Sequence, residues 1–176
     1  MRAELFSSDF MISFFIFLSA LIIIAAYYQN LQTDVSETST RNDMYAKAIN
    51  IGSLLATTSG YPQYWNSTSV QVIGLYDSGK FNLTKLEYLI NHTDDIGTDD
   101  VNYQEARTKL GTGAYNFLIS LKNTTGDVIQ KPGSNYNYSY GKPLTNEEQV
   151  MIVKRLGVVD LGGNVTKVTM EVILWV

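Results

Sequence analysis

Six asparagines carry the most recognisable chemistry in this sequence, because each stands two positions before a serine or threonine. The pattern Asn-x-Ser/Thr accepts N-linked glycans on proteins exposed outside the cell. Chance would give about two such patterns, since the chain has 13 asparagines, and serine plus threonine occupy 30 of its 176 positions. The excess predicts a glycosylated surface, although short polar residues also gather in turns. The six candidates are Asn66, Asn82, Asn91, Asn123, Asn137 and Asn164.

Catalytic and metal-binding chemistry is poorly represented. The chain has no cysteine and one histidine, His92, so it offers neither a thiolate nor a histidine-rich metal site. Four nearby aspartates could supply oxygen ligands to Ca²⁺, but their spacing is not that of a calcium loop, and a solvated acidic loop is expected. They are Asp94, Asp95, Asp99 and Asp100. We therefore expect no enzyme, no metal and no cofactor; a hydrolase built on converging carboxylates is a remaining alternative.

The charge balance excludes one class of partner. The sequence has 13 basic and 17 acidic side chains and a net charge of −4. It contains neither a cluster of lysines and arginines nor the basic balance that nucleic-acid binding requires. We expect no nucleic-acid partner.

A membrane is the partner that the sequence predicts most directly. Residues 10–28 are uncharged and almost entirely apolar. As a helix they would extend about 29 Å, close to the hydrocarbon thickness of about 30 Å. Tyr27 and Tyr28 stand where interfacial aromatic residues are common. The alternatives are a buried helix of a soluble core and a signal peptide cleaved after Ala26, but the apolar run is longer than a signal peptide needs.

The segment before the apolar run contains a short basic leader, a small residue and then Ser7, Asp9 and Phe10. This order resembles the class III signal peptide of archaeal type IV pilin-like proteins. The resemblance implies that a prepilin peptidase cuts the leader and leaves the apolar helix as a filament core. It also implies that Asp9 pairs with the new amino terminus. A cut between Glu4 and Leu5 places Asp9 correctly, whereas a cut after Ala3 supplies the small residue that the family has there.

Two further stretches resemble archaeal pilin-like proteins with this type of amino terminus. The first contains Gly60-Tyr61-Pro62-Gln63-Tyr64-Trp65, Val72-Ile73-Gly74-Leu75 and Asn82-Leu83-Thr84-Lys85-Leu86, and the second is the closing Glu171-Val172-Ile173-Leu174-Trp175. The resemblance implies self-association through the amino-terminal helices, or association with other pilin-like subunits. The residues expected to pack between helices are Phe14, Phe15, Phe17, Leu21 and Ile22.

The rest of the chain predicts an α+β fold. We expect residues 1–9 to form a leader, 10–28 the membrane or filament-core helix, 29–59 its amphipathic continuation, and 60–176 an extracellular β-rich head. Two adjacent apolar stripes in the continuation are expected to pack against the head. They are Leu31, Val35, Tyr45, Ile49 and Gly52, and Met44, Ala48, Ile51 and Leu55. A bend or fray is expected near residues 35–40, where helix formers are few.

Within the head, the pattern predicts short helices after Asn82 and over residues 101–110. It predicts strands near residues 70–75, 115–121, 148–159 and 165–176, with a loop over 131–143. Asp160 to Asn164 contains two glycines and signals a hairpin. The last two strands should form an antiparallel sheet with one face against the long helix.

These features predict a structural subunit of an extracellular pilus-like filament: a pilin, minor pilin or pseudopilin, with a role in adhesion as one option. The alternative is a membrane-anchored extracellular binding or sensory module that does not polymerise. Both place a single-pass anchor in the membrane and the carboxy-terminal head outside the cell.

Overall fold

The computed structural model describes residues 8–90, 101–134, 136–145 and 149–176. The chain divides into an N-terminal unit, Met1–Asn42, and a second unit, Asp43–Val176, which we call the head. The helix α1 (Ser8–Thr57) supplies the described part of the first unit and continues into the second.

α1 begins with Ser8 and carries the acid Asp9 in its first turn, where the helix dipole favours a negative charge. The helix runs without a break through residues 35–40, so it does not fray there. Its end is formed as expected, near the glycine and proline that follow. The Thr57 and Thr58 hydroxyls donate to carbonyls one turn back, at 2.7 and 2.8 Å, and Gly60 then turns the chain with a φ of 77°.

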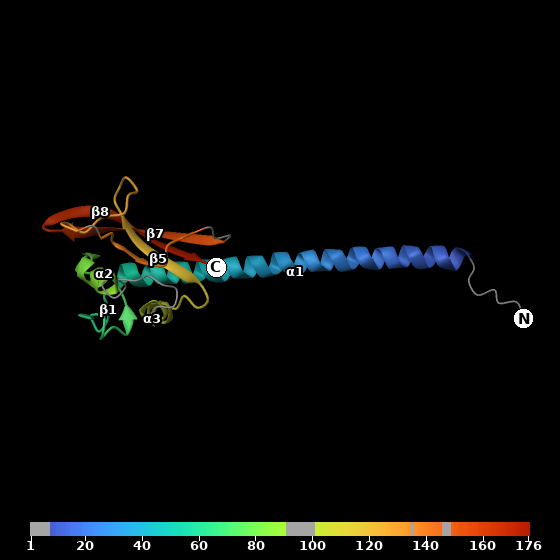
Figure 1. Ribbon diagram of the computed structural model, residues 1–176, viewed down its shortest axis with the longest axis horizontal. Coiled ribbons are helices and arrows are strands. Elements are labelled where there is room, and N and C mark those ends of the chain that lie inside the picture. The colour runs from blue at the N-terminus through green and yellow to red at the C-terminus, as the bar shows by residue number, and fades with distance from the viewer. Residues whose placement is uncertain (1–7, 91–100, 135, 146–148) are drawn as a thin grey trace, which may run out of the picture. The chain divides into compact units, whose positions relative to one another are not determined.

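The head contains a mixed sheet of six strands in the order β3-β4-β7-β8-β5-β6 (Figure 1). All neighbours are antiparallel except β4 and β7, which pair in parallel at Phe81 and Val159. A two-stranded ribbon of β1 and β2 lies outside this sheet. The strands are β1 (Gly60–Tyr61), β2 (Val72–Ile73), β3 (Tyr76–Asp77), β4 (Lys80–Phe81), β5 (Asn116–Lys122), β6 (Ser139–Gly141), β7 (Val150–Leu161) and β8 (Asn164–Trp175).

The hairpin of β7 and β8 is the longest strand pair and confirms the prediction for the end of the chain. Its register runs from Val150 opposite Trp175 to Leu161 opposite Asn164. Gly162 and Gly163 form the two-residue turn, with φ of 66° and 95°. Positive φ at both central residues is the geometry of a type I′ turn, whose twist matches that of the strands.

Two local predictions for the head are wrong. The expected loop over residues 131–143 contains the strand β6, in which Tyr140 pairs with Ile119 of β5. Tyr138 and Tyr140 alternate as in a strand, and their side chains are each only 3% exposed. The glycine, serine and asparagine residues around them are typical of a loop, so the sequence pattern predicted a loop instead. The strand expected near residues 70–75 is reduced to the two residues of β2, and the chain then turns into the small hairpin of β3 and β4.

The core of the head lies between the sheet and three helical segments. Figure 1 shows β7 and β8 on one side of the end of α1 and β1 and α3 (Val101–Leu110) on the other, with α2 (Leu83–Ile90) beside that end. One stripe of α1 is fully covered there, and one apolar face of β8 closes the core from the opposite side. The buried residues of these two faces are Met44, Ala48, Ile51 and Leu55 of α1, and Val168, Met170, Val172 and Leu174 of β8.

The second apolar stripe of α1 packs against the head only in part: Ile49 packs against the core and Gly52 is buried, whereas its other three members are exposed. Leu31 and Val35 lie in the N-terminal unit and are 43% and 68% exposed, and Tyr45 is 52% exposed. The expectation assumed one continuous contact along residues 29–59. The head begins only at Asp43 and covers the stripe that begins with Met44, so Leu31 and Val35 have no part in its core.

Candidate functional site

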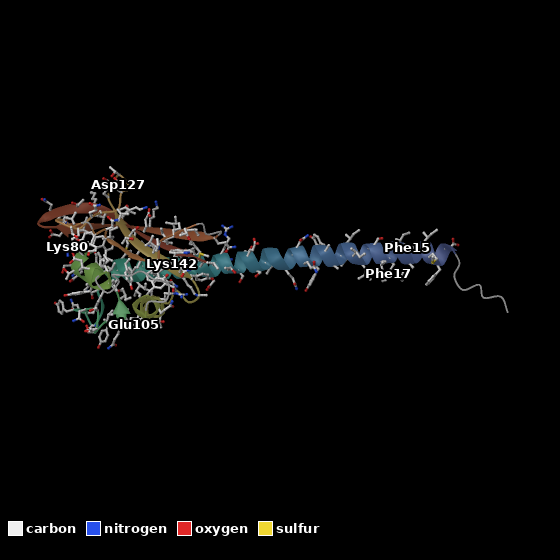
Figure 2. The ribbon with its side chains drawn as sticks, viewed as in Figure 1. Phe15, Phe17, Lys80, Glu105, Asp127 and Lys142 are labelled. Carbon is white, nitrogen blue, oxygen red and sulfur yellow. The ribbon has the colours of Figure 1, made fainter. Side chains whose placement is uncertain are left out.

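The most unusual surface of the molecule is the first half of α1. Every side chain of α1 from Asp9 to Gln32 is exposed, and the segment 10–28 contains no charge. Figure 2 shows Phe15 and Phe17 on this part of the helix. The residues expected to pack between helices are all exposed, at 49% for Phe14, 60% for Phe15, 62% for Phe17, 48% for Leu21 and 62% for Ile22.

This surface needs a partner other than water. A helix that is apolar on all sides is stable where lipid or other apolar helices surround it. α1 is the one helix in the described part of the chain that is long and apolar enough to cross a membrane. Within the helix the rings of Phe10 and Phe14 stack with centroids 6.4 Å apart, and the Ser19 hydroxyl donates to the Phe15 carbonyl at 2.8 Å. This serine is therefore satisfied inside the helix.

The predicted processing and assembly residues fall largely outside the described part of the chain. Ala3, Glu4, Leu5 and Ser7 precede it, whereas Asp9 and Phe10 lie in the first turn of α1 and are exposed. The Asp9 carboxylate therefore lies at the start of the helix, immediately before the uncharged segment.

Two of the glycan acceptors share one local geometry. The side-chain oxygen of Asn66 accepts hydrogen bonds from the Thr68 amide at 3.0 Å and the Thr68 hydroxyl at 2.9 Å. The Asn123 oxygen likewise accepts from the Thr125 amide at 3.0 Å, and the Thr125 hydroxyl lies 2.6 Å from both this oxygen and the Asp127 carboxylate. In both, Asn Nδ2 has no hydrogen-bond partner among the described residues, so the nitrogen that would carry the glycan is available.

The other acceptors differ from this geometry. Asn137 and Asn164 are exposed, the latter as the first residue of β8 beside the hairpin turn. Asn82 caps α2 through a 3.3 Å bond from the Lys85 amide, and its Nδ2 donates to Asp77 at 3.5 Å, so both ends of this amide are engaged. Asn91 lies outside the described residues, as do Asp94, Asp95, Asp99 and Asp100. The described part of the chain contains no cluster of three or more potential metal ligands.

The corner after α1 holds the start of the head in place. Trp65 is 1% exposed, and its indole nitrogen donates to the carbonyls of Ser59 at 2.9 Å and Gly74 at 3.2 Å. The ammonium of Lys85 donates to the same Ser59 carbonyl and lies 5.8 Å from the Trp65 ring centre. Burial lowers the pKa of Lys85, although the charge of Asp77 opposes this shift. The bonds explain why a buried lysine occurs here, and they give it a structural role.

A second buried charge lies on the outer face of the sheet. Glu171 of β8 is 5% exposed, and its carboxylate contacts Lys122 of β5 at 2.6 Å and Lys154 of β7 at 2.9 Å. Burial would raise the pKa of Glu171, but hydrogen bonds from the two lysines outweigh it and hold the pKa below the ordinary value. The alternation of side chains along β8 places Glu171 opposite the core-facing Met170 and Val172, but it gives no sign of the burial of Glu171, because the two lysines meet it only through the register of the sheet.

The alternating tyrosines 136, 138 and 140 differ in exposure. Tyr136 is 62% exposed, but Tyr138 and Tyr140 belong to the core. The Tyr138 hydroxyl donates to Glu87 at 3.0 Å, and Lys131 contacts the same carboxylate at 2.9 Å. Burial, followed by this hydrogen bond and the carboxylate charge, raises the pKa of Tyr138 to about 12.

Comparison of the chain with protein-family models, curated proteins and solved structures found no match.

Proposed function

We propose that the chain is a structural subunit of an extracellular, type IV pilus-like filament, anchored through α1 and displaying a glycosylated head. The observation that carries this proposal is the uncharged surface of residues 10–28, which is exposed on every side of a continuous helix. Burying such a surface contributes about 25 cal/mol per Å² of apolar area, whether the surrounding medium is lipid or neighbouring helices. Subunits reside in the membrane before assembly, and in the filament the helices of other copies replace the lipid around α1.

Three further features support the proposal. Asp9 stands at the start of the helix, where its carboxylate can pair with an amino terminus created by a prepilin peptidase. The head buries a continuous core, and exposed acceptor asparagines lie at its surface. The two buried charged side chains of the described head, Lys85 and Glu171, are held by structural bonds.

Replacement of Asp9 by alanine tests the proposal. If this acid sets the register of subunits, electron microscopy of cells with Asp9→Ala should show loss of filaments while the subunit remains in the membrane. Glu37→Ala removes another exposed carboxylate of α1 and is the matched control, in which filaments should persist. Wild-type numbers of filaments in Asp9→Ala cells would contradict the assigned role.

Mass analysis of the mature amino terminus separates this function from the alternative. A filament subunit should have lost the leader, by a cut after Ala3 or Glu4. An intact leader on protein isolated from the membrane would instead support the non-polymerising binding or sensory module.

A further inference from the structure

A small pocket in the head lies between α2 and the loop that precedes β6. It has a volume of about 120 Å³ and combines aromatic, aliphatic and polar side chains. A cavity of about 150 Å³ holds a benzene ring, so this pocket has room for most of one six-membered ring. Its lining includes Glu87 and Ile90 of α2 and Lys131, Ser134, Tyr136 and Tyr138 from the loop and the start of the next strand.

The loop holds Tyr136 in a defined position beside the pocket. Gln130 and Asn137 pair as an antiparallel bridge, and the Lys131 amide donates to the Tyr136 carbonyl at 2.8 Å. Inside the loop the Ser134 amide donates to the Lys131 carbonyl at 3.1 Å, and the Tyr136 amide donates to the Ser134 hydroxyl at 3.2 Å. The Tyr136 side chain is nevertheless 62% exposed. A large aromatic ring is therefore presented to solvent by a backbone that is well bonded.

The polar groups of the pocket meet at one carboxylate. Glu87 Oε1 accepts a hydrogen bond from the Tyr138 hydroxyl at 3.0 Å, and Glu87 Oε2 accepts one from the Lys131 ammonium at 2.9 Å. Each carboxylate oxygen can accept two hydrogen bonds, and an ammonium can donate three. Glu87 and Lys131 therefore keep capacity for a ligand. The pocket offers an acceptor and a donor side by side, next to an aromatic ring.

This combination matches the chemistry of a neutral sugar. The charges of Glu87 and Lys131 cancel, so the lining residues present no excess charge to an anion or a cation. Adjacent hydroxyls of a sugar ring each donate and accept hydrogen bonds, and they lie about as close together as the carboxylate and the ammonium. The C–H face of the same ring is apolar and can pack on an aromatic side chain. A wholly apolar ligand would instead remove water from the two charged groups without replacing its hydrogen bonds.

We propose that this pocket binds one ring of a neutral sugar. Tyr136 packs on the face of the ring, and Glu87 and Lys131 bond to two adjacent hydroxyls, while the Tyr138 hydroxyl holds Glu87 in place. Sugar recognition goes beyond the proposed filament and does not require assembly. Two sources of the ring are compatible with the site. One is a glycan of another molecule, and the other is a glycan on Asn137, which also lines the pocket.

The test uses the full-length protein, produced in a host without N-glycosylation and kept in a detergent that contains no sugar. Saturation-transfer NMR measures the binding of four probes: the methyl glycosides of glucose, galactose, mannose and N-acetylglucosamine. We expect at least one of them to bind with a roughly millimolar Kd, which is the range that a ligand of this size reaches.

Variants of exposed tyrosines assign the binding to the pocket. Tyr136→Ala should weaken it by about tenfold or more, whereas Tyr136→Phe should bind like the wild type because it keeps the ring. Tyr64→Ala is the matched control, since Tyr64 is 83% exposed and does not line the pocket, and its binding should be unchanged. If none of the four sugars binds, or if Tyr136→Ala binds as well as the wild type, the inference is wrong and the filament proposal is unaffected. Absence of filaments together with normal sugar binding would reject only the filament.

The natively glycosylated protein identifies the source of the ring. If it binds the same sugars as the unglycosylated protein does, the natural ligand belongs to another molecule. If it binds them only as Ser139→Ala, which removes the acceptor pattern at Asn137, the pocket is occupied by the glycan of the chain itself.

Discussion

Replacement of Glu171 by glutamine tests how the head tolerates a nearly buried charge. The carboxylate is 5% exposed and lies 2.6 Å from the Lys122 ammonium and 2.9 Å from that of Lys154. Glutamine keeps the size of the side chain but removes its charge. Its amide can accept a hydrogen bond at one atom only and presents a donor to the second lysine, where no acceptor is left.

The two contacts should contribute unequally. The Lys154 side chain is 63% exposed, and an exposed pair of this kind contributes at most about 1 kcal/mol. The Lys122 side chain is 29% exposed, and a hydrogen bond to a charged group in a more buried position contributes about 1.5–3 kcal/mol. We expect Glu171→Gln to lower the free energy of unfolding by about 1.5–3 kcal/mol and the Tm by roughly 5–10 °C. Lys122→Met should cost more than Lys154→Met.

Unfolding can be followed in the full-length protein in detergent, because Trp65 and Trp175 are 1% and 0% exposed and both lie in the head. Their fluorescence should change when the head unfolds. Equal stability of the wild type and Glu171→Gln at neutral pH would refute the reasoning. A larger loss in Lys154→Met than in Lys122→Met would refute the assignment of the stronger contact.

The same variant predicts a pH dependence of definite sign. Because the pKa of Glu171 is lower in the folded protein, the carboxylate contributes its stabilisation at pH values above its ordinary pKa of about 4.3. The stabilisation is lost as the pH falls through the lowered pKa of the folded state. The difference in unfolding free energy between wild type and Glu171→Gln should therefore be complete at pH 7 and close under acidic conditions. A difference that does not change with pH would show that the charge is not its source.

Three further predictions concern Gly60 in the corner after α1, Tyr138 with its hydrogen bond to Glu87, and the glycan acceptors. Gly60 and Gly79 have φ of 77° and 85°, but a Cβ on Gly60 would collide with the Val72 carbonyl oxygen, whereas Gly79 has no atom within 4 Å of that position. Thermal unfolding should therefore show a loss of more than about 3 kcal/mol for Gly60→Ala and about 1–2 kcal/mol for Gly79→Ala, and equal losses would contradict the proposed clash. Ultraviolet titration should show one tyrosine that ionises near pH 12, and this step should be missing in Tyr138→Phe. The stabilisation linked to the raised pKa of Tyr138 should be lost as the pH rises from about 10 to about 12. An unchanged titration curve in the variant would refute this assignment. Glycopeptide mass spectrometry should find glycans at Asn66 and Asn123 that are lost in Thr68→Ala and Thr125→Ala respectively, with Asn82 unmodified because its amide is engaged; a glycan on Asn82 would contradict this ranking.

Sequence patterns predicted those parts of the fold that depend on neighbours along the chain. The length and apolarity of residues 10–28, the glycine pair in the hairpin and the cap at Asn82 are all local, and the corresponding elements appear in the structure. The α+β class and the buried faces of α1 and β8 were also predictable, because the periods of helix and strand assign side chains to faces. The glycan acceptors are likewise a local pattern, and their modification stays a prediction.

Contacts between distant segments could not be predicted in this way. The burial of Glu171 depends on a register that aligns three strands, and the buried Lys85 finds its acceptor at Ser59, 26 positions away along the chain. The same holds for the stripe with Leu31 and Val35. Periodicity identified the stripe as apolar, but only the tertiary structure showed that the core of the head takes in Ile49 and leaves Tyr45 exposed. A sequence determines which side chains share a face, since that follows from backbone geometry; what covers the face depends on the packing of segments far apart in the chain.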